Sequence, residues 1–295
     1  IAAMTAEARR IGSRNVHERL SVGNPGDELG QLAITFNEVL QRVDSALEQQ
    51  RRFTADASHE LRTPVALIRA EADVALSEGA ASDGEYRAAL SVIRDGSQQL
   101  SRIVNDLFLL ARADAGQTVM SPHVMYLDEL VSSTVQSMRL LADAKHIQLH
   151  VLPLAEVSFQ ADEELLRRAL FNLLDNAIRY SPDASQVHVA LERDEKWYRI
   201  AVTDDGPGIG ADDQLHIFER FFRGDSSRAH SESANGAGAG LGLAIAREIA
   251  ELHGGQLRLR RSDASGSSFE LILPATGSVE LVTFPLGRSA GLPLP

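Results

Sequence analysis

The stretch Asn172-Leu173-Leu174-Asp175-Asn176-Ala177-Ile178-Arg179-Tyr180 decides how the second half of this 295-residue chain is interpreted. In a helix, Asn172, Asn176 and Arg179 lie on one face, because residues three and four apart are neighbours there. Asparagine is a poor helix former, so two asparagines among leucines need an explanation. Amide oxygens can bind Mg²⁺, and an arginine can pair with phosphate. A polar face turned to solvent gives the same pattern, so this helix alone leaves both interpretations open.

Two glycine clusters follow this helix. Asp204-Asp205-Gly206-Pro207-Gly208 comes directly after an apolar strand, and Gly238-Ala239-Gly240-Leu241-Gly242-Leu243 opens a helix. Glycines at a helix start let backbone N–H groups approach phosphate, and the helix dipole favours the anion. Most loop glycines only form turns, so each cluster alone is weak evidence. No Lys-Ser or Lys-Thr follows the second cluster, which excludes a Walker-type loop.

Strand and helix signals alternate around these motifs between residues 116 and 275. The expected elements are helices at 127–143, 162–180 and 241–252, and strands at 148–152, 157–160, 186–192, 197–203, 256–260 and 267–273. This order predicts an α/β sandwich, with a mostly antiparallel sheet on one side of the helices. The tail 276–295 contains glycine and proline without periodicity, and we expect it to be extended or disordered.

Helical periodicity dominates the first 115 residues instead. Apolar residues recur at spacings of three and four at Leu29, Leu32, Phe36, Leu40, Val43 and Leu47. Pro64 interrupts the continuation and predicts a bend, because a proline inside a helix removes a hydrogen bond at a cost of about 3 kcal/mol. After a turn at 79–84, a second amphipathic helix extends from Tyr86 to Leu110. One helical hairpin buries little apolar surface, so two chains are expected to form a dimeric four-helix bundle.

The composition restricts the possible partners. Hydrophobic residues make up 44% and charged residues 24%, as in soluble globular modules. A formal net charge of −12 disfavours nucleic acid, whose phosphates require a basic face. The chain has no cysteine, which excludes disulfides and thiolate metal sites. No run approaches the ~18 apolar residues of a membrane span, and no signal-peptide pattern opens the chain.

Four motifs, taken in order, resemble the N, G1, F and G2 boxes of the histidine-kinase ATP-binding domain. They are residues 172–180, 204–208, Phe218-Glu219-Arg220-Phe221-Phe222-Arg223 and 238–242. The resemblance implies the fold shared by gyrase, chaperone and mismatch-repair ATPases, an α/β sandwich of the GHKL (Bergerat) type. Four motifs that occur in the order of the family are not explained by chance.

The same resemblance implies roles for individual residues. Asp204 would hydrogen-bond the adenine amine, and Asn176, with Asn172 near it, would hold Mg²⁺. Arg179 and Tyr180 would face the phosphates of ATP; arginine stands where lysine is common, which affects ATP affinity. Residues 210–237 would form a lid that nucleotide orders. The other expected nucleotide-binding residues are Gly206, Gly208, Phe221, Gly238, Gly240, Leu241 and Gly242.

The stretch Phe53-Thr54-Ala55-Asp56-Ala57-Ser58-His59-Glu60-Leu61-Arg62-Thr63-Pro64 resembles the H box of sensor kinases along its whole length. The resemblance implies that His59 is the phosphoacceptor, and a neutral imidazole is nucleophilic. Glu60 would orient the ring and accept its other proton. Thr63 would position a water for dephosphorylating the partner protein. A zinc-protease motif would need a histidine where Thr63 stands, so that alternative is excluded.

The extreme N-terminus has a third resemblance. Asp27-Glu28-Leu29-Gly30 followed by Phe36-Asn37 resembles the second half of a HAMP relay module, whose first helix here lacks its usual opening proline. We therefore expect a fragment that begins inside HAMP, with transmembrane and sensor regions upstream, as the cytoplasmic portion of a plasma-membrane protein. The expected domains are a partial HAMP with its connecting coiled coil, a dimerisation and phosphotransfer domain, a catalytic ATP-binding domain and a tail of unassigned role, at 1–48, 49–115, 116–275 and 276–295.

Together these resemblances imply a sensor histidine kinase of a two-component system. It would phosphorylate its own His59 with Mg-ATP, transfer the phosphoryl group to an aspartate of a response regulator, and also act as that regulator's phosphatase. The expected assembly is a homodimer. Three alternatives stay open: a dimeric scaffold that only binds ATP, a gyrase- or chaperone-type ATPase, and a protein of the same fold in which phosphatase activity dominates. A trapped phosphohistidine would separate a kinase from the scaffold and the ATPase.

Overall fold

The computed structural model describes residues 15, 17–22, 24–77, 82–152, 156–224 and 239–275. The chain divides into two compact units, Ile1–Ile103 and Val104–Pro295, here called the N-terminal and C-terminal units. Gly238, residues 79–81 of the expected turn at 79–84, the later part of the expected lid and the tail 276–295 lie outside the described residues.

The long helix α2, Glu28–Leu76, begins where the sequence places a cap and a close approach. The Asp27 carboxylate accepts the Gly30 N–H at 2.7 Å, which satisfies an amide of the first turn. A Cβ on Gly30 would lie 1.8 Å from the Asn24 carbonyl oxygen, so only glycine fits at this position beside the preceding backbone. The Asn37 side chain accepts the Leu20 N–H at 2.8 Å and donates to the Leu20 carbonyl at 3.0 Å. Leu20 and Asn24, which precede α2, are therefore held against the first turns of this helix.

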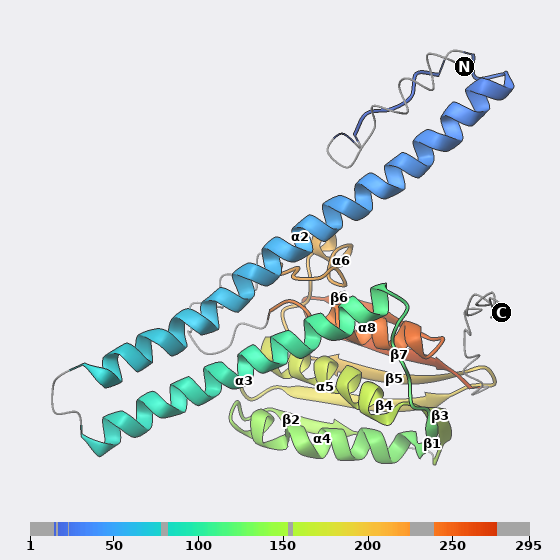
Figure 1. Cartoon of the computed structure of the whole chain (residues 1–295). Helices are drawn as coiled ribbons and strands as arrows, with labels where there is room; N and C mark the ends of the chain where they lie inside the picture. Colours follow the sequence, from blue (N-terminus) through green and yellow to red (C-terminus); the bar gives the residue numbers. More distant parts are fainter. Residues whose placement is uncertain are drawn as a thin grey trace, which may run out of the picture. The chain divides into compact units, whose positions relative to one another are not determined.

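A helical hairpin forms from α2 and α3, the latter spanning Asp83–Asp114 (Figure 1). Pro64 is a buried residue inside α2. A Cβ on Gly96 of α3 would lie 2.9 Å from Ile68 Cγ1, so the two helices approach closely at this glycine. The expected all-α hairpin is confirmed. Large apolar side chains along it stay exposed in the single chain, among them Leu32, Phe36, Val39, Val43, Val65, Val74, Leu76, Tyr86 and Leu90.

The C-terminal unit is built on a five-stranded sheet with the order β2-β4-β5-β7-β6. Its strands are β2 Gln148–Val151, β4 Gln186–Arg193, β5 Trp197–Asp204, β6 Gln256–Asp263 and β7 Gly266–Pro274. All neighbouring pairs are antiparallel except β2 with β4. The helices α4 Leu127–Asp143, α5 Glu163–Tyr180 and α8 Gly242–Leu252 form a layer over the sheet (Figure 1). The expected α/β sandwich is confirmed.

Apolar side chains fill the space between this helix layer and the sheet. Val187, Val189 and Leu191 alternate along β4 with residues of the other face, as period-2 burial requires. The last eleven residues of α3 belong to this unit, and Leu110 is fully buried in its core. Two short elements were not expected from the sequence. They are helix α6, Ala211–Gln214, and strand β1, His123–Tyr126, which pairs with β3, Ser158–Ala161, in a separate two-stranded sheet.

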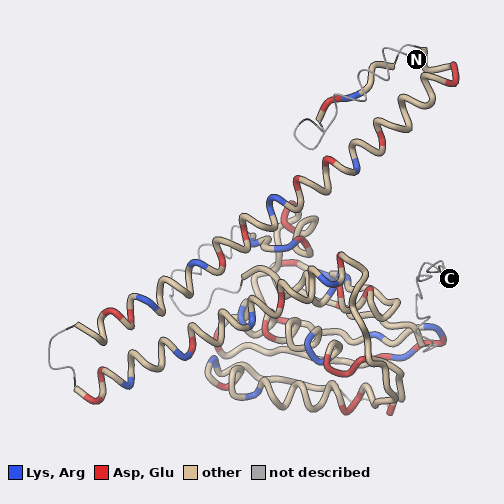
Figure 2. The backbone as a smooth tube through the Cα atoms, in the orientation of Figure 1, with Lys and Arg blue, Asp and Glu red and all other residues tan. Residues whose placement is uncertain are grey.

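Charges are distributed without a continuous basic surface stripe along the two long helices. Acidic and basic residues are interspersed along α2 and α3 (Figure 2). In the part of the chain that the structure describes, no helix is long and apolar enough to cross a bilayer.

Candidate functional site

His59 lies on α2 in the N-terminal unit, and its side chain is exposed. Thr63 is one helical turn further along, and its Oγ1 donates to the His59 carbonyl oxygen at 3.4 Å. Pro64, the next residue, is buried. Glu60 is half-buried beside the histidine. An exposed imidazole on a rigid helix is accessible to a second reactant, which is what a phosphoacceptor requires.

In the C-terminal unit, α5 presents the two predicted asparagines. Its N-cap Asp162 accepts the Leu165 N–H at 3.2 Å, and apolar residues on the opposite face are buried in the core. Asn172 and Asn176 are both half-buried. The Asn172 Nδ2 is buried and makes no hydrogen bond among the described residues. A buried amide without a partner is costly, so this atom is a candidate for contact with a ligand.

Lys145 fixes the end of the same helix. Its Nζ donates to the carbonyl oxygens of Ile178, Arg179 and Ser181 at 3.1, 2.8 and 3.2 Å. A cation at a helix C-terminus also interacts favourably with the helix dipole. The Arg179 guanidinium donates to Asp175 at 2.8 Å, and Tyr180 is 41% exposed. The end of α5 is therefore held in place while Tyr180 remains accessible.

The carboxylate of Asp204, at the end of β5, is buried with only 4% of the residue exposed. Its Oδ1 accepts the N–H groups of Gly206 at 2.8 Å and of Ser267 at 3.2 Å. Burial raises the pKa of the Asp204 carboxyl, although the two N–H donors oppose this shift. A buried acid with fixed orientation and a perturbed pKa is a common feature of ligand sites.

The first glycine cluster is held by the β6–β7 turn. Gly208 has φ +75°, and a Cβ there would lie 2.1 Å from the Asp263 carbonyl oxygen. The next N–H, of Ile209, donates to the Ser262 hydroxyl at 2.8 Å. Gly206 is also confined, since its Cβ would lie 3.1 Å from the Tyr180 carbonyl oxygen. The end of α5 and the first glycine cluster therefore lie in contact.

The second glycine cluster meets both α5 and the phenylalanine-rich segment. A Cβ on Gly242 would lie 3.7 Å from the Asn172 side chain. The Phe221 N–H donates to the Gly240 carbonyl oxygen at 3.0 Å, and both residues have positive φ, +61° and +68°. Leu241, which follows Gly240 and directly precedes α8, is buried. The C-terminal unit thus brings together the predicted residues of all four boxes that the structure describes.

Three family models match this chain. The "Histidine kinase-, DNA gyrase B-, and HSP90-like ATPase" model matches residues 161–277, the "His Kinase A (phospho-acceptor) domain" model 49–116, and the HAMP domain model 1–45. The chain belongs to the two-component sensor histidine kinases.

Individual relatives agree with this family. "Sensor histidine kinase MtrB" of Mycobacterium leprae is 32% identical over 287 residues, which are 95% of this chain and 50% of the relative. The chain therefore spans about half the length of the curated relatives it matches. Among solved structures, Acinetobacter baumannii histidine kinase AdeS has a TM-score of 0.59 at 22% identity, covering 74% of this chain and 98% of that one. Histidine kinase ThkA in complex with response regulator protein TrrA has a TM-score of 0.59 at 20% identity, covering 81% and 66%.

Two contributors to this candidate site were missed in the sequence. Gly266 has φ +127°, and a Cβ there would lie 1.8 Å from the Asp204 carbonyl oxygen. Ser267 donates its N–H to the Asp204 carboxylate. These residues face Asp204 because β5 and β7 pair with Asp204 opposite Ser267. The only signal in the sequence was a glycine in a polar turn, which does not indicate a partner sixty-three residues earlier.

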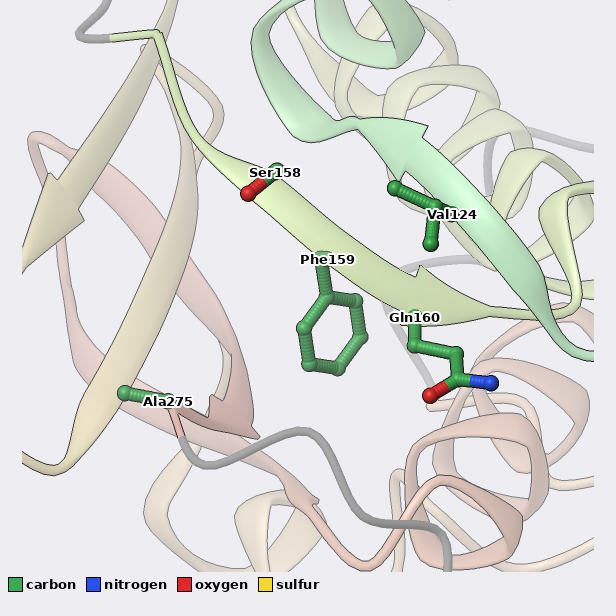
Figure 3. A pocket seen from close by; sticks show the side chains of 5 residues that line it. All are labelled: Val124, Ser158, Phe159, Gln160 and Ala275. Carbon is green, nitrogen blue, oxygen red and sulfur yellow. The ribbon is translucent and has the colours of Figure 1, made fainter.

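Two other features lie apart from these boxes. A cavity of about 200 Å³ is lined by Val124, Ser158, Phe159, Gln160 and Ala275, beside the two-stranded sheet (Figure 3). It contains none of the predicted site residues. In the described part of the chain, one group of possible metal ligands occurs, His17, Asp44 and Glu48 in the N-terminal unit. Asp44 also pairs there with Arg19 at 3.5 Å, so the group is an exposed ion-pair cluster as it stands.

Proposed function

We propose that this chain is an ATP-dependent protein histidine kinase that phosphorylates His59. The observation that carries the proposal is the convergence of Asp204, Asn172 and the glycines at 206, 240 and 242 in one unit of a chain whose other unit exposes His59 on a helix. Buried polar groups and close backbone approaches are what a nucleotide site needs, because phosphates are bound by backbone N–H groups near a helix start.

ATP is the proposed substrate, and its two ends would meet different residues. The Asp204 carboxylate is already oriented through Oδ1, and Oδ2 would accept a hydrogen bond from the adenine amino group. Gly206 and Gly208 let the loop after β5 pack against Tyr180 and Asp263, which holds this loop beside the Asp204 carboxylate. The start of α8, at Gly240, Leu241 and Gly242, would bind the phosphates together with Gly238. Phe221 would shape the same loop.

Mg²⁺ is implied by the family, and the residues present fit it. Half a turn about the Cβ–Cγ bond exchanges the oxygen and nitrogen of Asn172, so its unpartnered buried amide can supply an oxygen ligand. Asn176 would supply another, because amide oxygens are hard ligands. Bound Mg²⁺ would neutralise charge that develops on the transferred phosphate. Arg179 and Tyr180 would contribute beside the phosphates, Arg179 from its position next to Asp175.

In the proposed reaction, a neutral nitrogen of the His59 ring attacks the γ-phosphorus of ATP. The bond from that phosphorus to the bridging oxygen breaks, and ADP leaves with the electron pair. Glu60 would orient the ring and accept the proton of its other nitrogen. The phosphoryl group would then pass to an aspartate carboxylate of a response regulator. Thr63, one turn below His59, would orient a water that removes phosphate from that aspartate.

The proposed assembly is a homodimer at the N-terminal unit. Its exposed apolar side chains along α2 and α3 would be covered by those of a second copy, completing a four-helix bundle. The response regulator is proposed as the second partner, supported by the fact that a histidine kinase of similar fold was solved in complex with one. We further propose that the chain is the cytoplasmic portion of a plasma-membrane sensor.

The test is incubation with γ-labelled ATP and Mg²⁺. Wild type should incorporate label that is lost in acid and stable in base, as expected for a phosphorus–nitrogen bond. His59→Gln should bind ATP and incorporate none, while Asp204→Asn should fail at the binding step. Label retained by His59→Gln would mean that another residue is the acceptor. A wild-type chain that binds ATP without incorporating label would favour a scaffold.

A further inference from the structure

Within the C-terminal unit, two ion pairs join the end of α3 to other elements, and neither has a role in the proposed nucleotide chemistry. Asp106 pairs with Arg168 of α5, and Asp114 pairs with Arg220 of the phenylalanine-rich segment. All four residues belong to the C-terminal unit. The two ion pairs differ in the neighbours of their arginines. Arg220 directly precedes Phe221, whose N–H donates to Gly240 at the start of the proposed phosphate-binding loop.

The Asp114–Arg220 ion pair has the geometry of a strong interaction. Arg220 Nη1 donates to Asp114 Oδ2 and Nη2 to Oδ1, both at 2.6 Å, as two parallel hydrogen bonds. The Arg220 side chain is only 18% exposed. Its hydrogen bond to Asp114 raises the pKa of Arg220 against the effect of burial, and Glu248 of α8 adds to the rise. Asp114 is therefore a main partner of a largely buried cation.

Arg220 is joined directly to a strained position. The next residue, Phe221, has φ +61°, a conformation that a phenylalanine adopts only when its surroundings impose it. Its N–H donates to Gly240, and a Cβ on Gly240 would lie 2.8–2.9 Å from Phe221 backbone atoms. Two residues further, Gly242 lies beside Asn172. A continuous set of contacts thus extends from Asp114 to the loop that opens α8.

We propose that Arg220 is a positioning residue for nucleotide binding, held by Asp114 at the end of α3. By fixing Arg220, Asp114 keeps Phe221 in its strained conformation and Gly240 in contact with it. The loop 240–242 is thereby preorganised for phosphate. Part of the nucleotide affinity is then set at the end of the helix α3. The inference rests on the proposed function, because it takes this loop as the phosphate-binding one.

The experiment measures ADP binding to the full chain by calorimetry in the presence of Mg²⁺. Asp114→Asn and Arg220→Gln should each raise the dissociation constant about fivefold, since coupling between neighbouring sites commonly has this size. The double variant should be no weaker than either single one, because both remove the same interaction. Asp114→Glu, which keeps the charge, should restore binding to within about twofold of wild type.

Asp106→Asn is the matched control, because it breaks the other ion pair of the same helix. It should leave the dissociation constant within about twofold of wild type. Unchanged affinity in Asp114→Asn would overturn the inference, as would equal weakening by Asp106→Asn or additive effects in the double variant. A wild-type chain that binds no ADP at all would overturn the nucleotide site itself, and the inference with it.

Discussion

Asp204 is the residue at which function and stability are expected to respond in opposite directions. Burial raises the pKa of this carboxyl in the folded protein. Its protonated form therefore stabilises the fold at pH values below the unfolded-state pKa, and this stabilisation is lost as pH rises through the folded-state pKa. Asp204→Asn removes a desolvated charge and keeps an oxygen for the Gly206 and Ser267 N–H groups. It places a donor where the adenine amine also donates. We predict nucleotide binding weaker by about 100-fold and an unchanged or higher melting temperature at pH 7.

Calorimetric titration with ADP and thermal unfolding on the same samples check this prediction. A protein that loses binding only because it unfolds would show both losses together. Normal ADP affinity in a folded Asp204→Asn variant would contradict the role proposed for this carboxylate.

His253 gives a prediction about pH at the same scale. Its ring is buried; Nε2 accepts the Asp162 N–H at 3.2 Å, and Nδ1 contacts the Ile249 carbonyl at 2.7 Å. Burial lowers the pKa of His253, so the fold favours the neutral ring. The stabilisation is therefore present above about pH 6.5 and is lost as pH falls through the lowered pKa. The melting temperature should fall between pH 7.5 and 5.5, and less so in His253→Gln.

His123 serves as the comparison, because the carbonyl of Ser121 and then Glu163 raise the pKa of its exposed ring. Its contribution is present below the unfolded-state pKa and lost as pH rises, which is the opposite direction. His123→Gln should therefore leave the acid-side loss of stability in place. A pH profile of His253→Gln identical to that of wild type would contradict the account of His253.

Among the elements, α5 depends on a single lysine at its C-terminal end. Lys145→Met keeps the apolar stem but removes three hydrogen bonds to the carbonyls of residues 178, 179 and 181. We expect the free energy of unfolding to fall by about 1–2 kcal/mol, measured by denaturant titration. Lys196→Met, at an exposed lysine, is the control and should change little. Equal losses in the two variants would argue against a capping role.

The elements also show where sequence reasoning succeeds. The helix expected at 127–143 is observed with those bounds, and the one expected at 162–180 begins one residue later. Apolar periodicity marks the buried face of both helices, and the capping Asp162 marks the start of the second. The strands at 186–193 and 197–204 alternate clearly and were expected within one residue. Strand β1 was missed because it has only four residues and buries one of them.

Contacts between elements that are distant in the sequence could not be predicted from the sequence. Gly266 and Ser267 join the Asp204 site only through the register of β7 against β5. The contact of Phe221 with Gly240 depends on a positive φ at phenylalanine, which no propensity predicts. In contrast, Asn172 and Asp204 could be identified because each lies in a short local pattern with a physical requirement for that residue type.

At the scale of the whole molecule, the exposed apolar residues of the N-terminal unit predict a dimer. Leu90 of α3 is 63% exposed in the single chain. Leu90→Glu would place a charge inside the proposed four-helix bundle, where burying it without a partner is costly. Sedimentation at micromolar concentration should show a dimer for wild type and a shift towards monomer for this variant. Leu140→Glu, at an 85% exposed residue of α4, should stay dimeric; a monomeric wild type would contradict the bundle.

The central claim is that the phosphoryl group of ATP is transferred to His59, and direct localisation tests it best. After incubation with Mg-ATP, the chain is digested with trypsin at neutral pH and the phosphopeptides are fragmented by mass spectrometry. Cleavage after Arg52 and Arg62 yields one peptide that contains His59 together with Thr54 and Ser58. We predict phosphate on the imidazole of His59 alone. Phosphate on a hydroxyl of that peptide, or on another histidine, would contradict the account.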